Sequence, residues 1–78
     1  MARPLSEIAA EISEDWKNPY YGVVPYLQAL SCLDKVTDMY GSDTASGIVR
    51  YFLINAGTWR GPVARRIKAE LKGMVNGS

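Results

Sequence analysis

A chain of 78 residues, of which 47% are hydrophobic, is long enough for one domain with one core. The large apolar content and a charged fraction of only 22% exclude an intrinsically disordered chain, and a net charge of +1 is low for a nucleic-acid-binding protein. A single cysteine excludes a disulfide framework, and the absence of histidine removes the commonest general base and metal ligand.

The first predicted element is an amphipathic helix over residues 5–17. Its apolar residues recur at helical spacing and form one core-facing stripe of Leu5, Ile8, Ala9, Ile12 and Trp16. Three glutamates occupy the opposite side, which we expect to be a solvated acidic face. The helix ends at Asn18-Pro19, because proline disfavours helical geometry in the residue before it.

A second helix is predicted over residues 23–40, with Pro25 in its first turn, where a missing N–H costs no hydrogen bond. Its core face would carry Tyr26, Ala29, Leu30, Leu33, Val36 and Tyr40. Gly41 is expected to close this helix in the left-handed conformation. We expect Cys32 to be a buried or half-buried thiol, since free cysteine usually behaves as a small hydrophobic residue.

The third predicted helix, over residues 43–56 with Ser42 or Asp43 as its cap, is apolar on two sides. One broad stripe comprises Ala45, Ile48, Val49, Phe52, Leu53 and Ala56. The second, on the other side, consists of Gly47, Tyr51 and Ile54. A helix that is apolar nearly all round is central in a bundle or buried in an oligomer, so self-association is expected.

The fourth predicted helix covers residues 62–74 and points Arg65, Lys68 and Lys72 outward. No segment shows the strict alternation of a half-buried strand. The sequence therefore predicts an all-α fold, a compact four-helix bundle-like arrangement that forms a single domain over residues 1–78.

Charge is distributed unevenly along the chain. Residues 1–43 carry three cationic side chains against seven carboxylates, a net charge of −4, whereas residues 44–78 carry six against one, a net charge of +5. We expect an acidic stripe on the first helix and a basic stripe on the fourth, both exposed. Such stripes can pair between subunits or meet a charged partner.

The expected setting is cytoplasmic. No apolar run approaches the ~20 residues needed to cross a bilayer, and the first residues lack the continuous apolar stretch of a secretory signal. A lone cysteine also fits a reducing compartment. We therefore expect no membrane association.

We expect a binding protein and not an enzyme, with no catalytic residue, no cofactor and no metal site. The glutamates of the first helix lack a neighbouring apolar pocket that would shift a pKa towards neutrality. The leading hypothesis is protein–protein interaction, with another protein or as a homo-oligomer. The interface candidates are Gly47, Tyr51, Ile54, Tyr20, Tyr21 and Trp59.

The alternative hypothesis is DNA binding through the basic helix 62–74, by analogy with a helix-turn-helix. A related hypothesis is an anion site at the turn 57–62, and in both cases ordinary turn formation and a solvated basic surface are the simpler explanations. The nucleic-acid or anion candidates are Thr58, Arg60, Arg65, Arg66, Lys68 and Lys72.

Three segments carry a resemblance: DWKNPYYGVVPYL, IVRYFLINAGTWRG and ARRIKAELKGM. With them the chain resembles, from about Leu5 to Met74, short uncharacterised proteins encoded by phages and integrative mobile elements of Firmicutes. The resemblance implies a mobile-element context, in which small helical proteins act as regulators, DNA-binding accessories or inhibitors of host proteins. It implies no site residue.

Overall fold

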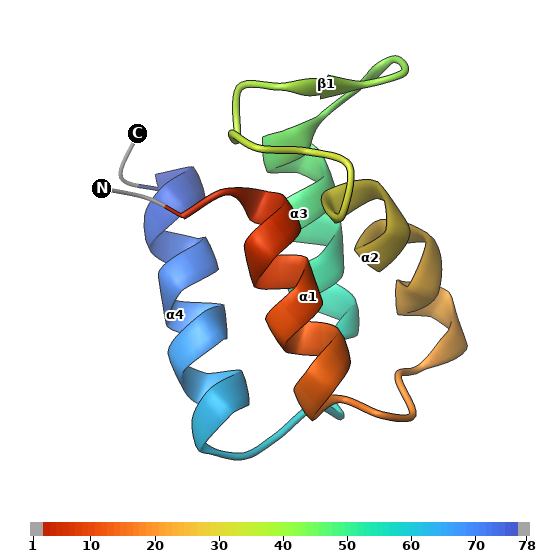
Figure 1. Cartoon of the computed structure of the whole chain (residues 1–78), viewed down its shortest axis with the longest axis vertical. Helices are drawn as coiled ribbons and strands as arrows, with labels where there is room; N and C mark the ends of the chain where they lie inside the picture. The colour runs from red at the N-terminus through yellow and green to blue at the C-terminus, as the bar shows by residue number, and fades with distance from the viewer. Residues whose placement is uncertain (1–2, 77–78) are drawn as a thin grey trace.

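The computed structural model describes residues 3–76, so that two residues at each end of the predicted domain lie outside the described range. Within that range it has four α-helices and one short β-hairpin (Figure 1). The elements are α1 (Leu5–Asp15), the 3-10 turn η1 (Tyr21–Val23), α2 (Val24–Leu30), β1 (Met39–Tyr40), β2 (Asp43–Thr44), α3 (Ala45–Asn55) and α4 (Pro62–Asn76). The mostly helical fold is confirmed, although the hairpin makes the description all-α only approximate.

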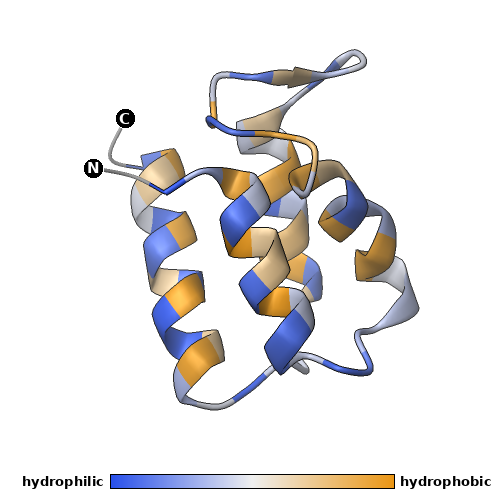
Figure 2. Cartoon of the chain, viewed as in Figure 1, coloured by the Kyte–Doolittle hydropathy of each residue, from blue (hydrophilic) through white to orange (hydrophobic). Residues whose placement is uncertain are grey.

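The four helices surround one core. Helices α1 and α3 each pack against both α2 and α4 (Figure 1). Hydrophobic and hydrophilic residues alternate along α1 and α4 at helical spacing (Figure 2), which is why each buries one side. The predicted stripe of the first helix is confirmed, since all five of its residues are buried. The largest fully buried side chains are Phe52, Leu5, Ile8, Ile12, Leu30, Ile67, Leu71, Val23 and Val49.

The predicted second helix over residues 23–40 is wrong beyond Leu30. Ser31 Oγ donates to the carbonyl of Gln28 (2.6 Å), and the Asp38 carboxylate accepts from the backbone N–H groups of Asp34 and Lys35, both at 3.0 Å. These hydrogen bonds lower the pKa of Asp38 below its ordinary value, and the bond from Lys35 contributes most. Short polar side chains thus compete with the helix for backbone partners and turn the chain.

The hairpin occupies the end of the predicted helix and corrects two further expectations. Strands β1 and β2 pair antiparallel, with Met39 opposite Thr44. Gly41 does adopt a positive φ of 65°, but in the hairpin turn and not at a helix end. Tyr40, expected in the core, is exposed, whereas Leu33 is buried as predicted. Cys32 follows the end of α2 and is exposed, so the expectation of a buried thiol is wrong.

The segment between α2 and β1 also supplies hydrogen-bond acceptors to the first N–H groups of α1. The first N–H groups of a helix have no partner within the helix. Here Leu5 donates its backbone N–H to the carbonyl of Asp34 (2.9 Å), and Ser6 donates to that of Leu33 (2.8 Å). The segment therefore satisfies α1 by backbone contacts, and no side chain caps this helix.

The cap of the third helix differs from the prediction. Thr44, and not Ser42 or Asp43, is the N-cap of α3, and its Oγ1 accepts from the N–H of Gly47 at 3.1 Å. The other boundaries shift by a few residues, because α1 ends at Asp15 and α4 extends to Asn76.

Candidate functional site

The outer side of α3 presents apolar side chains to solvent. Tyr51 is 58% exposed and Ile54 74% exposed, while Phe52 on the inner side is fully buried. The Tyr26 ring, from α2, stacks on the Tyr51 ring with a centroid distance of 5.8 Å and an interplanar angle of 11°. We call this surface the α3 face and define it by Tyr26, Gly47, Arg50, Tyr51 and Ile54.

Tyr51 stands between two hollows of the α3 face. The larger, of about 510 Å³, is lined by Tyr26, Ser42, Asp43, Thr44, Gly47, Ile48 and Tyr51. The smaller, of about 330 Å³, is lined by Gly47, Arg50, Tyr51 and Ile54. Both hollows have Gly47 and Tyr51 in their linings, so they adjoin along α3. The three residues that the sequence places on the second face of this helix, Gly47, Tyr51 and Ile54, therefore border a common surface.

Gly47 has a local reason to be glycine. A Cβ at this position would lie 3.1 Å from Oγ1 of Thr44, the atom that caps α3. Gly47 lines both hollows of the α3 face and adds no side chain to either of them. A partner backbone can approach a helix most closely at such a position.

The remaining predicted interface aromatics lie elsewhere. Tyr20 and Tyr21 are exposed and pack on each other with ring centroids 4.8 Å apart, but they line neither hollow. Trp59 is not at the surface, because it is 2% exposed. Its ring stacks on Trp16 at 5.6 Å and meets Phe52 edge-on at 6.3 Å. Its inclusion among the interface candidates is therefore corrected, and it belongs to the core.

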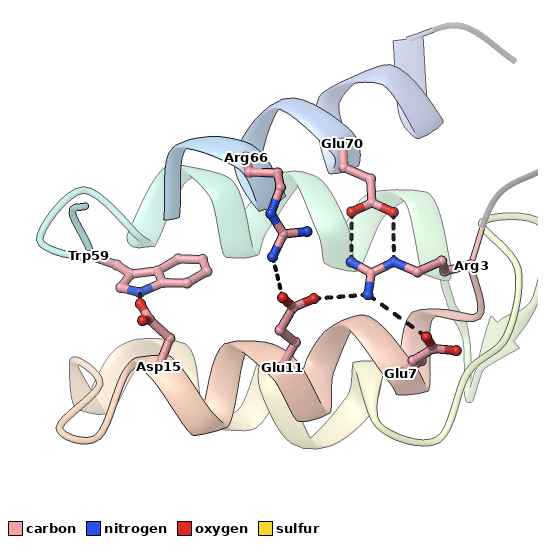
Figure 3. A network of polar contacts seen from close by, with 7 residues as sticks. All are labelled: Arg3, Glu7, Glu11, Asp15, Trp59, Arg66 and Glu70. Atoms are coloured by element: carbon pink, nitrogen blue, oxygen red, sulfur yellow. Dashed lines mark hydrogen bonds and ion pairs between the residues drawn. The ribbon is translucent and has the colours of Figure 1, made fainter. Parts of the chain in front are cut away.

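A charge network joins α1 to α4 (Figure 3). The Arg3 guanidinium donates to both carboxylate oxygens of Glu70, at 2.7 and 3.0 Å, and to Glu11 at 2.8 Å. Arg66 donates to the other oxygen of Glu11. These donors lower the pKa values of Glu11 and Glu70, and the same bonds raise the pKa of Arg3. The acidic and basic sides of the two helices thus meet partly within the chain, and Arg66 is engaged there.

The other basic residues gather at the start of α4. A hollow of about 300 Å³, the α4 pocket, is lined by Trp59, Arg60, Gly61, Ala64, Arg65 and Lys68. Lys68 Nζ donates to the carbonyl of Trp59 at 2.6 Å. Burial lowers the pKa of the Lys68 ammonium, and the charges of Lys72 and Arg60 lower it further. The structure therefore brings Arg60, Arg65 and Lys68 together, whereas Thr58 and Lys72 lie outside the lining.

The arrangement of α3 and α4 differs from that of the helix-turn-helix used as an analogy, and DNA binding through α4 stays a prediction. The two helices run antiparallel and side by side (Figure 1), whereas the helices of that motif meet at a steep angle. Arg66 is held by Glu11, whereas within residues 3–76 no carboxylate lies within ion-pair distance of Arg65, Lys68 or Lys72.

Sequence reasoning missed Arg3, Asp15 and Glu70 as structural partners. Arg3 reaches Glu70 across 67 positions, and Asp15 accepts the Trp59 indole N–H across 44. Nothing in helical periodicity links residues so far apart. The only available signal was the opposite charge of the first and fourth helices.

The described residues contain no group of three or more histidine, cysteine or acidic side chains placed to hold a metal ion. No helix within residues 3–76 is both long and apolar enough to cross a membrane. In comparisons with models of protein families, with curated proteins and with solved structures, the chain matches none of them.

Proposed function

We propose that the protein is a non-enzymatic protein-binding module that pairs with a second copy of itself through the α3 face. The observation that carries the proposal is the exposure of Tyr51 and Ile54 beside two adjoining hollows. Tyrosine is enriched among the residues that dominate binding energy, because its ring offers a large rigid contact area. A small domain also gains most from burying such a face, since its own core is limited.

The distribution of charge on this face supports a symmetric pair. Asp43 lines the larger hollow and Arg50 the smaller one, and the two residues lie on either side of Gly47. In a two-fold interface, residue i of one copy meets residue j of the other and the reverse contact is also made. An antiparallel crossing of two α3 helices near Gly47 therefore brings Asp43 of each copy towards Arg50 of the other.

The same crossing accounts for the apolar ends of the face. It directs Ile54 of one copy towards the hairpin of the other, where Met39 and Tyr40 are exposed. A stable dimer usually buries about 800 Å² on each partner. The exposed surface of the chain is 4932 Å², so such an interface would use about one sixth of it. The α3 face with the adjoining hairpin is the apolar surface best placed to supply this area.

Size-exclusion chromatography with light scattering tests the proposal directly. The expected result is a concentration-dependent dimer that Tyr51→Glu or Ile54→Glu converts to a monomer. Tyr21→Glu is the matched control, because Tyr21 is 81% exposed but lines neither hollow. A wild-type chain that stays monomeric at high micromolar concentration, or a dimer that is unchanged by both α3-face variants, overturns the proposal.

A charge exchange tests the orientation of the pair. Asp43→Arg and Arg50→Asp should each weaken dimerisation, because each places like charges opposite one another. The double variant should recover most of the wild-type dimer, since the opposite charges meet again in exchanged positions. Equal weakening in the single and double variants would exclude the antiparallel crossing.

The resemblance to mobile-element proteins supports a regulatory or host-inhibiting role for such a module.

A further inference from the structure

The α4 pocket is a second feature, independent of the α3 face. Arg60 precedes α4, and Arg65 and Lys68 come from its first two turns, so three cationic side chains line one hollow of about 300 Å³. Lys68 is held in place by its 2.6 Å bond to the carbonyl of Trp59. An ammonium has three donors, so two remain for a ligand.

The positive charge of the pocket is not compensated. The arginines of the charge network, Arg3 and Arg66, contact carboxylates at the edge between α1 and α4. In the part of the chain that the structure describes, no carboxylate lies within ion-pair distance of any of the α4-pocket cations. Lys72 and Arg60 also act electrostatically on Lys68, which places several positive charges close together. Cations gathered in a hollow without a partner attract a compact anion.

The chemistry of the lining selects the anion. Guanidinium groups offer paired N–H donors that match the oxygens of phosphate, and lysine binds phosphate as a point charge. The pocket also lies at the positive end of α4, a helix of 15 residues. No nucleobase can stack on Trp59, because its ring is buried against Trp16. The α4 pocket would therefore recognise only the anionic group of a ligand.

We propose that the α4 pocket binds a single phosphate group, as inorganic phosphate or as a phosphate monoester. Three cations converge on one hollow, whereas the phosphates of a duplex require cations spread along a surface. Lys72, one turn beyond Lys68 and outside the lining, distinguishes the two arrangements.

The test is a titration of the full chain with inorganic phosphate and with O-phosphoserine, followed by amide chemical shifts. Ionic strength is held constant with chloride, because salt screens exposed charges. Saturable one-to-one binding is expected, with the largest shifts in residues 59–68. Arg65→Gln and Lys68→Gln should each weaken binding by about tenfold, whereas Lys72→Gln should change it by less than about threefold. Arg60→Gln gives the same test on an exposed side chain.

Serine and duplex DNA are two further probes. Serine tests whether the phosphate group of O-phosphoserine is required, and duplex DNA tests the alternative of nucleic-acid binding. Serine should not bind, and a response to O-phosphoserine beyond that to inorganic phosphate would indicate a monoester ligand. Three outcomes overturn the site: shifts that do not saturate, equal losses in Lys72→Gln and the α4-pocket variants, or salt-sensitive binding to duplex DNA without saturable phosphate binding. Failure of dimerisation leaves this result unaffected, because none of these residues lines the α3 face.

Discussion

The indole Nε1 of Trp59 donates a 2.8 Å hydrogen bond to Oδ2 of Asp15, and thereby joins the end of α1 to the segment before α4 (Figure 3). The ring that makes this bond stacks on Trp16 and contacts Phe52 edge-on. A buried indole needs a partner for its one N–H group. Asp15 supplies it from the edge of the aromatic cluster.

Loss of this bond should destabilise the fold. Asp15→Ala leaves the indole N–H without its partner and should lower the free energy of unfolding by about 1–3 kcal/mol, measured by urea denaturation. Glu14→Ala, a change at the neighbouring exposed carboxylate, should have little effect. In a Trp59→Phe background the cost of Asp15→Ala should fall to less than half, because the donor is gone. An unchanged cost in that background would show that Asp15 acts otherwise.

The charge network should make stability fall in acid. Arg3 and Arg66 lower the pKa values of Glu11 and Glu70 below their ordinary value of 4.5. The unfolded chain then takes up protons first, so the contribution of the network is complete above that value and is lost as pH falls through the lowered values. Arg3→Gln should lower the melting temperature at neutral pH, and its difference from wild type should shrink below pH ~4 and in high salt. A pH-independent difference would contradict this.

The cap of α3 should also be measurable. Thr44→Ala removes the acceptor for the Gly47 N–H and should cost about 1 kcal/mol in chemical denaturation. Thr44→Ser keeps the hydroxyl and should restore most of the loss. Comparable destabilisation by both substitutions would mean that the threonine methyl group, and not the cap, is responsible.

The hairpin turn requires a left-handed residue. Gly41 has a φ of 65° with open space around it, so Gly41→Ala should destabilise through backbone strain by about 1 kcal/mol. Gly41→Asn should be tolerated better, since asparagine visits this conformation more readily. Gly57→Ala is the control, because Gly57 also has open space but no positive φ. Equal effects at the two glycines would exclude strain as the cause.

Periodicity predicts the parts of the fold that are locally encoded. Helices α1 and α4 each carry one uninterrupted apolar stripe, and their positions could be predicted within a few residues. The predicted second helix extends too far because Leu33 and Val36 continue the helical spacing of apolar residues. The backbone nevertheless turns there, where Ser31 and Asp38 hydrogen-bond to backbone groups. The spacing of apolar residues does not reveal whether the backbone groups form helical hydrogen bonds or bonds to nearby polar side chains.

The α3 face and the α4 pocket also differ in how far the sequence predicts them. The second apolar side of α3 could be predicted because it depends only on positions within one helix. The contacts of Trp59 with Trp16 and Asp15 could not, because these two residues lie more than 40 positions earlier in the chain. The convergence of Arg60 and Lys68 likewise depends on how the segment before α4 turns, which its glycines leave open.

The contact between the first and last helices has a consequence for synthesis. Helix α1 leaves the ribosome before α4, yet Arg3 contacts Glu70, 67 positions later, and α4 packs against both α1 and α3. Translation proceeds at about 5–20 residues per second. The apolar sides of α1 and α3 that pack against α4 therefore stay exposed for several seconds, until α4 has been synthesised. Helices α2 and α3, which are in contact with each other, can associate before then. The domain therefore completes its core only when α4 has emerged.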